Sequence, residues 1–197
     1  MASERRIAGP EAKNRGALLD AAESLMRDEG YAAVTSRRVA ERAGLKPQLV
    51  HYYFRTMDDL FRAVFRRRTE QGVEAQQRVR HAPNPLRALW MSLIENHDTA
   101  LVTEYAALAN HRKELRPEIA DAAQQFLENQ MELAGSLLAR HGIDADELPP
   151  AVAVSLIVGM SQLMALEDSL GLSVGRDEII GYFDRHLRKL DGSAGSK

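Results

Sequence analysis

The chain has 197 residues and a formal net charge of −2, and 45% of its residues are hydrophobic. This length fits a single domain or a small head joined to a body, and the apolar share is sufficient for a packed core. Cysteine is absent, which excludes a disulfide framework and thiolate metal sites and is compatible with a reducing cytoplasm.

The start of the chain and its most apolar stretch indicate where in the cell the protein is expected. Residues 1–16 are polar and basic without an apolar core, so they do not form a secretory signal. The stretch Ala151–Leu166 contains two serines, a glycine and a glutamine, and it is shorter than the roughly 20 residues of a membrane span. We therefore expect a cytoplasmic, nucleoid-associated protein with no membrane partner.

The small net charge conceals an uneven distribution. Met1–Arg68 holds 14 Lys and Arg against 9 Asp and Glu, a balance of +5, whereas Thr69–Lys197 holds 12 against 19, a balance of −7. A basic head on an acidic body favours polyanion binding at one end. Charge alone is equally compatible with two solvated surfaces, so the motif within the basic part decides between them.

The chain opens on a basic segment and a first helix. Residues 1–13, which include Arg5, Arg6 and Lys13, are predicted to form a flexible arm. Such an arm can follow phosphates or enter a minor groove, or it can be a disordered terminus. Asn14 suits the cap of a helix that ends near Glu29, because apolar residues recur there at helical spacing: Leu18, Ala21, Ala22, Leu25 and Met26.

Two short helices with a tight turn between them are predicted from Val34 to Leu60. Thr35 offers a capping hydroxyl to a helix over 36–43, and Gly44 suits the left-handed end of that helix. Pro47 fits the first turn of a helix over 47–54. Each helix has one apolar face, formed by Val39, Ala40 and Ala43 in the first and by Val50, Tyr53 and Phe54 in the second.

The second of these helices has the composition of a major-groove reader. Its exposed side carries polar, basic and aromatic residues. Gln48 can form a bidentate pair with adenine, and Lys46 can reach guanine O6 and N7 or a phosphate. His51 and Tyr52 suit backbone contact or packing on a thymine methyl group, although a surface histidine without a role is an alternative for His51.

The preceding helix is expected to cross the DNA backbone. Thr35, Arg37 and Arg38 lie at its start, where free N–H groups and the helix dipole favour a phosphate. The alternative is a surface ion pair of Arg38 with Glu41, or of Arg42 with a nearby acid, and such pairs contribute little.

These residues resemble the DNA-binding domain of the TetR family of bacterial transcriptional regulators. The resemblance covers about residues 11–71 and is specific as a pattern, carried by Ala21-Ala22, Leu25, Gly30-Tyr31, Thr35, Val39-Ala40, Ala43-Gly44, Tyr53-Phe54 and Leu60. It implies a three-helix DNA-binding head over residues 14–60 and a helical body over residues 61–190. The body would dimerise and bind a small organic effector, and no cofactor or metal is expected.

The chain departs from the family pattern at four places. Lys46 stands where a serine often caps the recognition helix, Gln48 where a small residue is common, and His51 where a tyrosine often touches phosphate. Met57 replaces a frequent lysine, whose phosphate contact Arg55 can supply. The predicted DNA-contacting residues are Thr35, Arg37, Arg38, Lys46, Pro47, Gln48, His51, Tyr52 and Arg55.

The remainder is predicted to be all-α. We expect helices over 58–80, 86–97, 101–110, 117–140, 150–170 and 177–190, about nine in total, and a mobile tail over 191–197. The resemblance places an effector pocket among the long helices. The candidate lining residues are Trp90, Ile94, His97, Tyr105, Phe126, Gln130 and Gln162, although core packing is the simpler interpretation of His97 and the aromatic residues.

The last two helices carry the predicted dimer interface. Their apolar stripes consist of Val152, Leu156, Gly159, Met160 and Leu163, and of Ile180, Phe183 and Leu187. Two such helices from each of two subunits would form a two-fold symmetric four-helix bundle, although both stripes can instead face their own core. Two heads one helical turn apart would read two-fold related half-sites in double-stranded DNA.

The sequence therefore predicts a ligand-responsive, sequence-specific DNA-binding regulator, in its simplest form a repressor that a small organic effector releases from its operator. An enzyme is not expected, because the chain has no Glu-x-x-His pair, no Gly-rich phosphate loop and no Gly-x-Ser-x-Gly elbow. The alternative is a helical protein-interaction module whose head binds a partner protein, which Met57 in place of a basic residue supports best.

Overall fold

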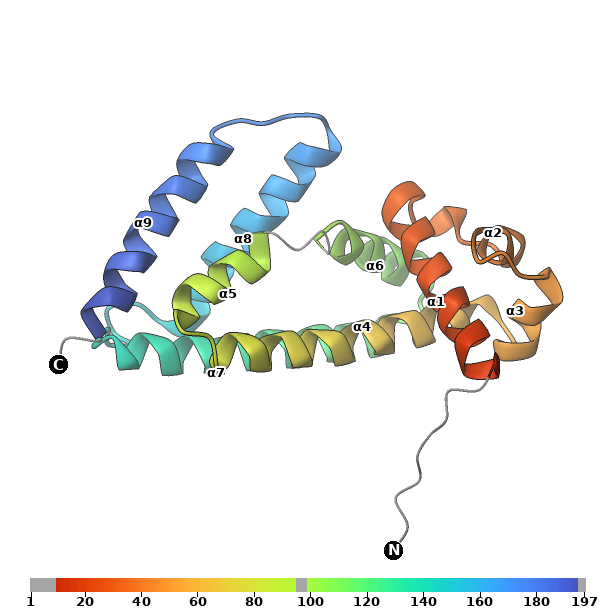
Figure 1. The fold of residues 1–197 in the computed structure, drawn as a ribbon, viewed down its shortest axis with the longest axis horizontal. Helices are drawn as coiled ribbons and strands as arrows, with labels where there is room; N and C mark the ends of the chain where they lie inside the picture. Colours follow the sequence, from red (N-terminus) through yellow and green to blue (C-terminus); the bar gives the residue numbers. More distant parts are fainter. Residues whose placement is uncertain (1–9, 95–98, 195–197) are drawn as a thin grey trace, which may run out of the picture. The chain divides into compact units, whose positions relative to one another are not determined.

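A computed structural model describes residues 10–94 and 99–194, and within these ranges all regular secondary structure is helical (Figure 1). The predicted all-α class is confirmed. The elements are α1 (Pro10–Glu29), the 3-10 helix η1 (Tyr31–Ala33), α2 (Ser36–Arg42), α3 (Pro47–Tyr53), α4 (Met57–Arg80), α5 (Pro85–Ile94), α6 (Thr99–His111), α7 (Arg116–Arg140), α8 (Pro150–Ser169) and α9 (Arg176–Ala194).

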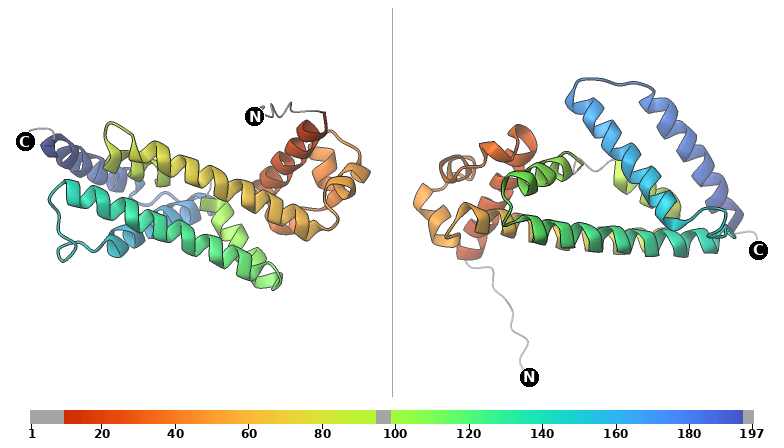
Figure 2. Two further views of the ribbon diagram at one scale, coloured as in Figure 1. Left: turned by 90° about the horizontal axis from the view of Figure 1, so that it is seen from below. Right: turned by 180° about the vertical axis from the view of Figure 1, so that it is seen from behind.

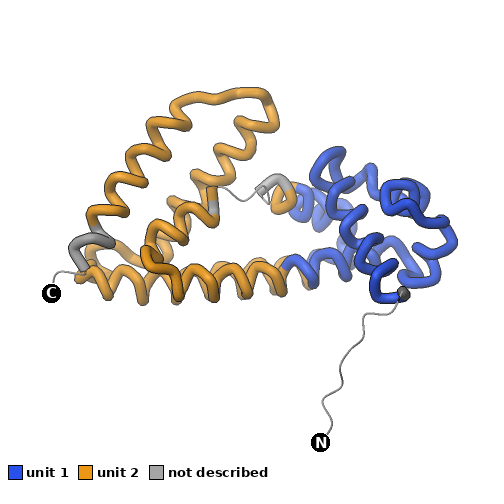
Figure 3. The backbone as a smooth tube through the Cα atoms, in the orientation of Figure 1, with its two compact units in different colours: residues 1–68, 104–116 blue, residues 69–103, 117–197 orange. Residues whose placement is uncertain are grey.

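The chain divides into two compact units (Figure 3). Unit 1 takes residues 1–68 and 104–116, and unit 2 takes residues 69–103 and 117–197. The division differs from the predicted boundary after residue 60, because the start of α4 and most of α6 join unit 1. Helices α4 and α6 are each unbroken, and each has residues in both units.

The core of unit 1 is formed by the faces that helical spacing predicts. Leu18 and Leu25 of α1, Val39 of α2, Val50 of α3 and Leu60 of α4 are all buried. Burying each such side chain contributes roughly 1.5–3 kcal/mol relative to leaving it exposed. The short helices α2 and α3 thus depend on tertiary packing, because isolated helices of their length are unstable in water.

The turn between α2 and α3 confirms the local prediction. The Thr35 hydroxyl accepts a hydrogen bond from the Arg38 N–H at 3.4 Å. Gly44 has a φ of 66°, its N–H donates to the Glu41 carbonyl at 3.1 Å, and the Leu45 N–H donates to the Ala40 carbonyl at 2.9 Å. This pattern is a Schellman motif, which ends α2 and leaves Pro47 to begin α3.

Two predicted helix starts are wrong. Helix α1 begins at Pro10 and not at Asn14, so residues 10–13 are helical and not part of an arm; residues 1–9, with Arg5 and Arg6, lie outside the described residues. Helix α4 begins at Met57 and not at Asp58. Thr56 and Asp59 cap it reciprocally, since each backbone N–H donates to the other side chain at 3.1 Å.

Side-chain contacts explain why part of α6 belongs to unit 1. The Glu104 carboxylate accepts a hydrogen bond from the Tyr31 N–H at 2.7 Å, next to the turn that ends α1. The Tyr31 ring stacks on His111 at 5.8 Å. Arg112 pairs with Asp58 at 2.5 Å at the start of α4. These contacts join segments far apart in the sequence.

The core of unit 2 lies where α4, α5 and α7 meet. Its buried members are Val79, Leu86, Leu89, Leu133 and Leu137, and Leu187 of α9 packs against them. The later part of α4 runs beside α7 (Figures 1 and 2), and their side chains meet where Arg80 lies 3.7 Å from Glu132. Helix α5 packs on α8 and α9, which run in opposite directions (Figure 1).

One other predicted bound changes. The helix predicted over 86–97 corresponds to α5, and the last part of the prediction falls on residues 95–98, which lie outside the described residues. Helix α9 continues to Ala194, so the tail does not begin at residue 191 as predicted. Residues 195–197 are likewise outside the described part.

Candidate nucleic-acid interface

Helix α3 separates an anchored face from an exposed one, as predicted. Val50 and Phe54 are buried and fix the helix to the core of unit 1. The opposite side is open to solvent and consists of Lys46, Pro47, Gln48, His51 and Tyr52. Lys46 is the N-cap residue and its side chain makes no capping hydrogen bond, so this ammonium extends from the end of the helix that is expected to enter a groove first.

The start of α1 lies beside this exposed face. The Tyr52 side chain, which is 67% exposed, donates its hydroxyl to Glu11 Oε1 at 3.4 Å. The Arg15 guanidinium lies 5.3 Å from the centre of the Phe54 ring, within cation–π range. Sequence analysis assigned neither Glu11 nor Arg15 to this site, because both are about 40 residues from α3 and no local pattern connects them.

In unit 1, ion pairs occupy several arginines and leave a few exposed cations near α2 and α3. Carboxylates lie within ion-pair distance of the guanidinium groups of Arg27, Arg38, Arg42, Arg62, Arg67 and Arg112. Within the described residues, no side-chain hydrogen bond or ion pair engages Arg37, Lys46 or Arg55. These three exposed cations lie at the start of α2 and at the two ends of α3, where a phosphate backbone would approach.

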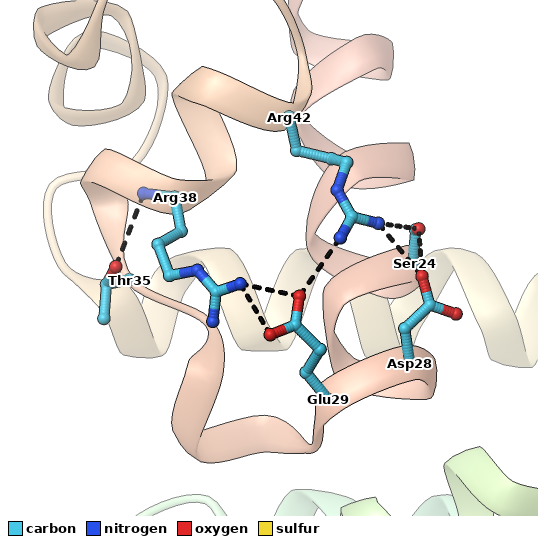
Figure 4. A network of polar contacts seen from close by, with 6 residues as sticks. All are labelled: Ser24, Asp28, Glu29, Thr35, Arg38 and Arg42. Carbon is cyan, nitrogen blue, oxygen red and sulfur yellow. Dashed lines mark hydrogen bonds and ion pairs between the residues drawn. The ribbon is translucent and has the colours of Figure 1, made fainter.

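Arg38 is held by α1 and not by its own helix (Figure 4). Its Nη2 donates to both carboxylate oxygens of Glu29 at 2.6 Å, and this hydrogen bonding raises the pKa of the Arg38 guanidinium above its usual range. The pairing partner predicted for it, Glu41, is therefore wrong, and its predicted phosphate contact has a competitor. Helical spacing along α2 could not indicate a partner on another helix.

Arg42 forms the second half of the same network. Its Nη1 donates to Asp28 Oδ2 at 2.9 Å and to the Ser24 hydroxyl at 2.7 Å, and its Nη2 donates to Glu29 Oε1 at 3.1 Å. These hydrogen bonds lower the pKa of the Asp28 carboxyl, Arg42 being the largest cause. The predicted pairing of Arg42 with a nearby acid is confirmed.

Comparison with known proteins identifies the head. Residues 18–64 match the family model described as bacterial regulatory proteins, tetR family. The HTH-type transcriptional regulator BetI of Rhizobium meliloti is 41% identical over 58 residues, which are 29% of this chain and 29% of that protein. The match to this relative therefore covers less than a third of either protein, and it does not reach most of the body.

Solved structures extend the likeness to the whole fold. A TetR transcription regulator from Haloarcula marismortui superposes with a TM-score of 0.66 and 17% identity, over 92% of this chain and 98% of that one. Residues 18–64 are thus a match to the DNA-binding domain of the tetR family, and most of the chain shares the fold of a solved TetR regulator. The transcriptional regulator FadR from Bacillus subtilis, in complex with stearoyl-CoA, gives a TM-score of 0.58 and 16% identity over 89% and 96% of the two chains.

The predicted effector residues are divided between the two units. Trp90 and Gln130 are buried in unit 2, Ile94 and Phe126 are half-buried there, and Gln162 is exposed on α8. Tyr105 belongs to unit 1, and its ring meets Phe65 edge-on at 4.9 Å. His97 lies outside the described residues.

Two of these buried side chains carry unpaired polar atoms. Trp90 Nε1 and Gln130 Oε1 have no hydrogen-bond partner within the described part of the chain. A buried donor or acceptor without a partner costs about 1–3 kcal/mol. An ordered water, or a ligand that supplies the missing partner, can satisfy such groups.

The predicted dimer stripes on α8 and α9 differ in their exposure. On α8, the side chains of Val152, Leu156 and Leu163 are 45%, 57% and 51% exposed; Gly159 is also exposed, and Met160 is half-buried. Helix α8 is long and apolar enough to cross a membrane by length and composition alone, unlike the shorter stretch considered in the sequence. An exposed apolar line of this kind is typical of an interaction surface.

The stripe predicted on α9 faces its own unit. The Phe183 ring stacks on Trp90 with ring centres 4.5 Å apart, and Leu187 packs against the core of unit 2. Ile180 is half-buried. Phe183 and Leu187 both stay half-buried, and their contact with a second subunit stays a prediction, because an amphipathic stripe indicates that a face is covered but not which neighbour covers it.

Proposed function

We propose that this protein is a homodimeric TetR-family repressor that binds a two-fold related operator and leaves it when a small organic effector binds unit 2. The observation that carries the proposal is the exposed face of α3. Gln48, His51 and Tyr52 face solvent while Val50 and Phe54 hold the helix in place, and the unpaired cations Arg37, Lys46 and Arg55 flank them. Base contacts by Gln48 specify the site, Arg37 and Arg55 bind phosphate, and Lys46 reaches either a guanine or a phosphate.

A second copy of the chain would cover the apolar side of α8. Val152, Leu156 and Leu163 recur at helical spacing and are about half exposed, which is unusual for large apolar residues along one line of a helix. Pairing α8 with its two-fold mate would bury this line and present two heads to one operator.

The effector is proposed to bind in unit 2 near Trp90 and Gln130. Trp90 Nε1 would donate a hydrogen bond to the effector and Gln130 Oε1 would accept one, so the ligand needs both an acceptor and a donor on an otherwise apolar body. FadR from Bacillus subtilis has this fold and was solved with stearoyl-CoA, which supports an organic ligand as the class without naming the one used here.

Release from DNA would follow from a population shift. A ligand that binds one arrangement of the two heads better than another shifts the equilibrium by its differential affinity, and a ligand with equal affinity for both shifts nothing. Helix α4 runs unbroken from Met57 to Arg80, and α6 runs from Thr99 to His111; each has residues in both units. These two helices are the proposed carriers of the movement.

DNA binding is tested by fluorescence anisotropy with the full chain and a duplex from the region upstream of its own gene. The matched control is a duplex of the same base composition in scrambled order. Tighter binding to the upstream duplex, with log affinity that falls steeply against log salt, supports the regulator. Equal affinity for the two duplexes at every salt concentration would contradict sequence-specific recognition of that region.

Effector binding is tested through Trp90, the single tryptophan of the chain. Its indole is fully buried and stacked on Phe183, so a ligand that reaches it should change its fluorescence. A compound that changes this emission and also lowers DNA affinity supports the mechanism. A compound that saturates the emission change and leaves DNA affinity unaltered contradicts it.

A further inference from the structure

Two arginines and two carboxylates form a closed network on the side of the head where α1 ends and α2 begins (Figure 4). Arg38 and Arg42 lie one turn apart on α2, and Asp28 and Glu29 close α1. Glu29 is central, because it accepts from Arg38 at 2.6 Å with both oxygens and from Arg42 at 3.1 Å with one. The two positive and two negative charges cancel locally.

The network lies at the surface and at the helix expected to cross the DNA backbone. The side chains of Arg38 and Glu29 are 41% and 37% exposed, so a phosphate could reach the same guanidinium. Arg37, the neighbour of Arg38, has no such partner within the described residues. Adjacent arginines on one helix therefore differ in their availability to DNA.

We propose that Glu29 is a positioning residue that keeps Arg38 away from DNA phosphates and thereby limits the sequence-independent part of DNA binding. The inference rests on the proposed DNA-binding function of the head. Isolated surface ion pairs are weak, but several charges in one network with short contacts hold their geometry better. Arg42 and Ser24 contribute to this, because Arg42 bridges Glu29 to Asp28 and Ser24 donates to Asp28 at 3.0 Å.

The proposed role of Glu29 predicts how DNA affinity depends on salt concentration. Each phosphate that a cation neutralises adds about −0.9 to the slope of log affinity against log salt. If Glu29 withholds Arg38, removing the charge of Glu29 adds one phosphate contact. A purely structural role of Glu29 would change stability or affinity without making the slope steeper.

The experiment measures binding of the full chain to a random-sequence duplex of about 30 base pairs between 50 and 200 mM NaCl, a range in which phosphate contacts dominate the change in affinity. The variants are Glu29→Gln, Arg38→Ala and their combination. The matched control is Asp20→Asn, which removes one carboxylate charge from the same helix, but from a residue that pairs with Arg67 of α4 and not with α2. Thermal unfolding of each variant verifies that the fold is retained.

We expect Glu29→Gln to steepen the slope of log affinity against log salt by about 0.9. The ratio of the variant's DNA affinity to that of the wild type should then grow about threefold as salt falls across this range. Arg38→Ala and Asp20→Asn should keep the wild-type slope, and the double variant should return to it. A Glu29→Gln slope equal to that of the wild type, or equal to that of Asp20→Asn, overturns the inference while leaving the proposed function intact. Failure of the wild type to bind any DNA at 50 mM salt overturns both.

Discussion

On α3, the local sequence determines which side chains are exposed to contact DNA and which are buried. Gln48 is exposed at the start of the helix and Val50 is buried beside it, because the two positions point to opposite faces of one turn. The exposed amide is free to meet a base edge, and the helix cannot rotate without exposing its apolar face. The proposed base contact of Gln48 therefore depends on this one side chain and not on the orientation of the helix.

Replacing Gln48 with alanine should remove discrimination at a single base pair. The expected loss is about 1–3 kcal/mol of binding free energy for the preferred base, with other positions of the operator unaffected. Competition assays with operator duplexes that carry each base substitution measure this. A uniform loss of affinity for every duplex would instead indicate that Gln48 contacts the backbone.

Tyr105 makes stability sensitive to alkaline pH. Burial is the main cause that raises the pKa of its phenol well above the ordinary value near 10, and the nearby Glu23 adds to it. Because the folded state keeps the proton to higher pH than the unfolded chain, the stabilising contribution is complete below about pH 10 and is lost as pH rises toward the folded pKa.

Tyr105→Phe tests this directly. The hydroxyl has no hydrogen-bond partner within the described residues, so its removal should raise the free energy of unfolding by about 1 kcal/mol near neutral pH. It should also reduce the loss of stability above about pH 10. Urea unfolding at neutral and alkaline pH measures both, and Tyr182→Phe, at a half-exposed ring, is the control that should change neither.

At the scale of elements, helix ends are determined by a few polar side chains. The start of α4 depends on the reciprocal bonds between Thr56 and Asp59. This Thr-x-x-Asp spacing is a sequence signal for a helix start, and it would have placed the start one residue earlier than Asp58. The end of α2 depends in the same way on Gly44, which adopts a positive φ without steric cost.

Thr56→Ala should destabilise the protein by about 1 kcal/mol, because it removes the side-chain acceptor for the Asp59 N–H. Chemical denaturation monitored by circular dichroism measures the change. Thr103→Ala, at an exposed position inside α6, is the matched control and should not destabilise the chain. An equal loss in both variants would show that capping is not the cause.

At the scale of the whole molecule, the exposed apolar line on α8 supports the proposed dimer. Leu156 and Leu163 are 57% and 51% exposed, and neither supports the core of unit 2. The proposed dimer gives these residues a covered environment, and it doubles the number of heads that act on one DNA site. The proposed dimer therefore also predicts an operator with two-fold related half-sites.

Leu163→Glu should convert a dimer into a folded monomer, because it places two charges against each other at the two-fold axis. Analytical ultracentrifugation measures the mass, and Leu127→Glu, at an exposed leucine of α7, is the matched control that should stay dimeric. A wild type that is monomeric and sediments with lipid vesicles would contradict the dimer and assign the apolar side of α8 to a membrane.

The sequence by itself determined the helix-turn-helix head and the order of the helices. Those features depend on signals that act within one or two helical turns, such as the cap at Thr35, the glycine at Gly44 and the apolar spacing of α1. The exposed residues of α3 followed from the same spacing, since a buried face on a short helix leaves its opposite face to solvent.

Only the tertiary structure decided which partner each residue meets. Arg38 pairs with Glu29 and not with Glu41, Phe183 stacks on Trp90, and Glu104 closes a turn 73 residues away at Tyr31. A charge or an apolar stripe shows that a side chain needs a partner, but the partner is chosen by packing between helices that are distant in the chain, and such contacts leave no periodic trace in the sequence.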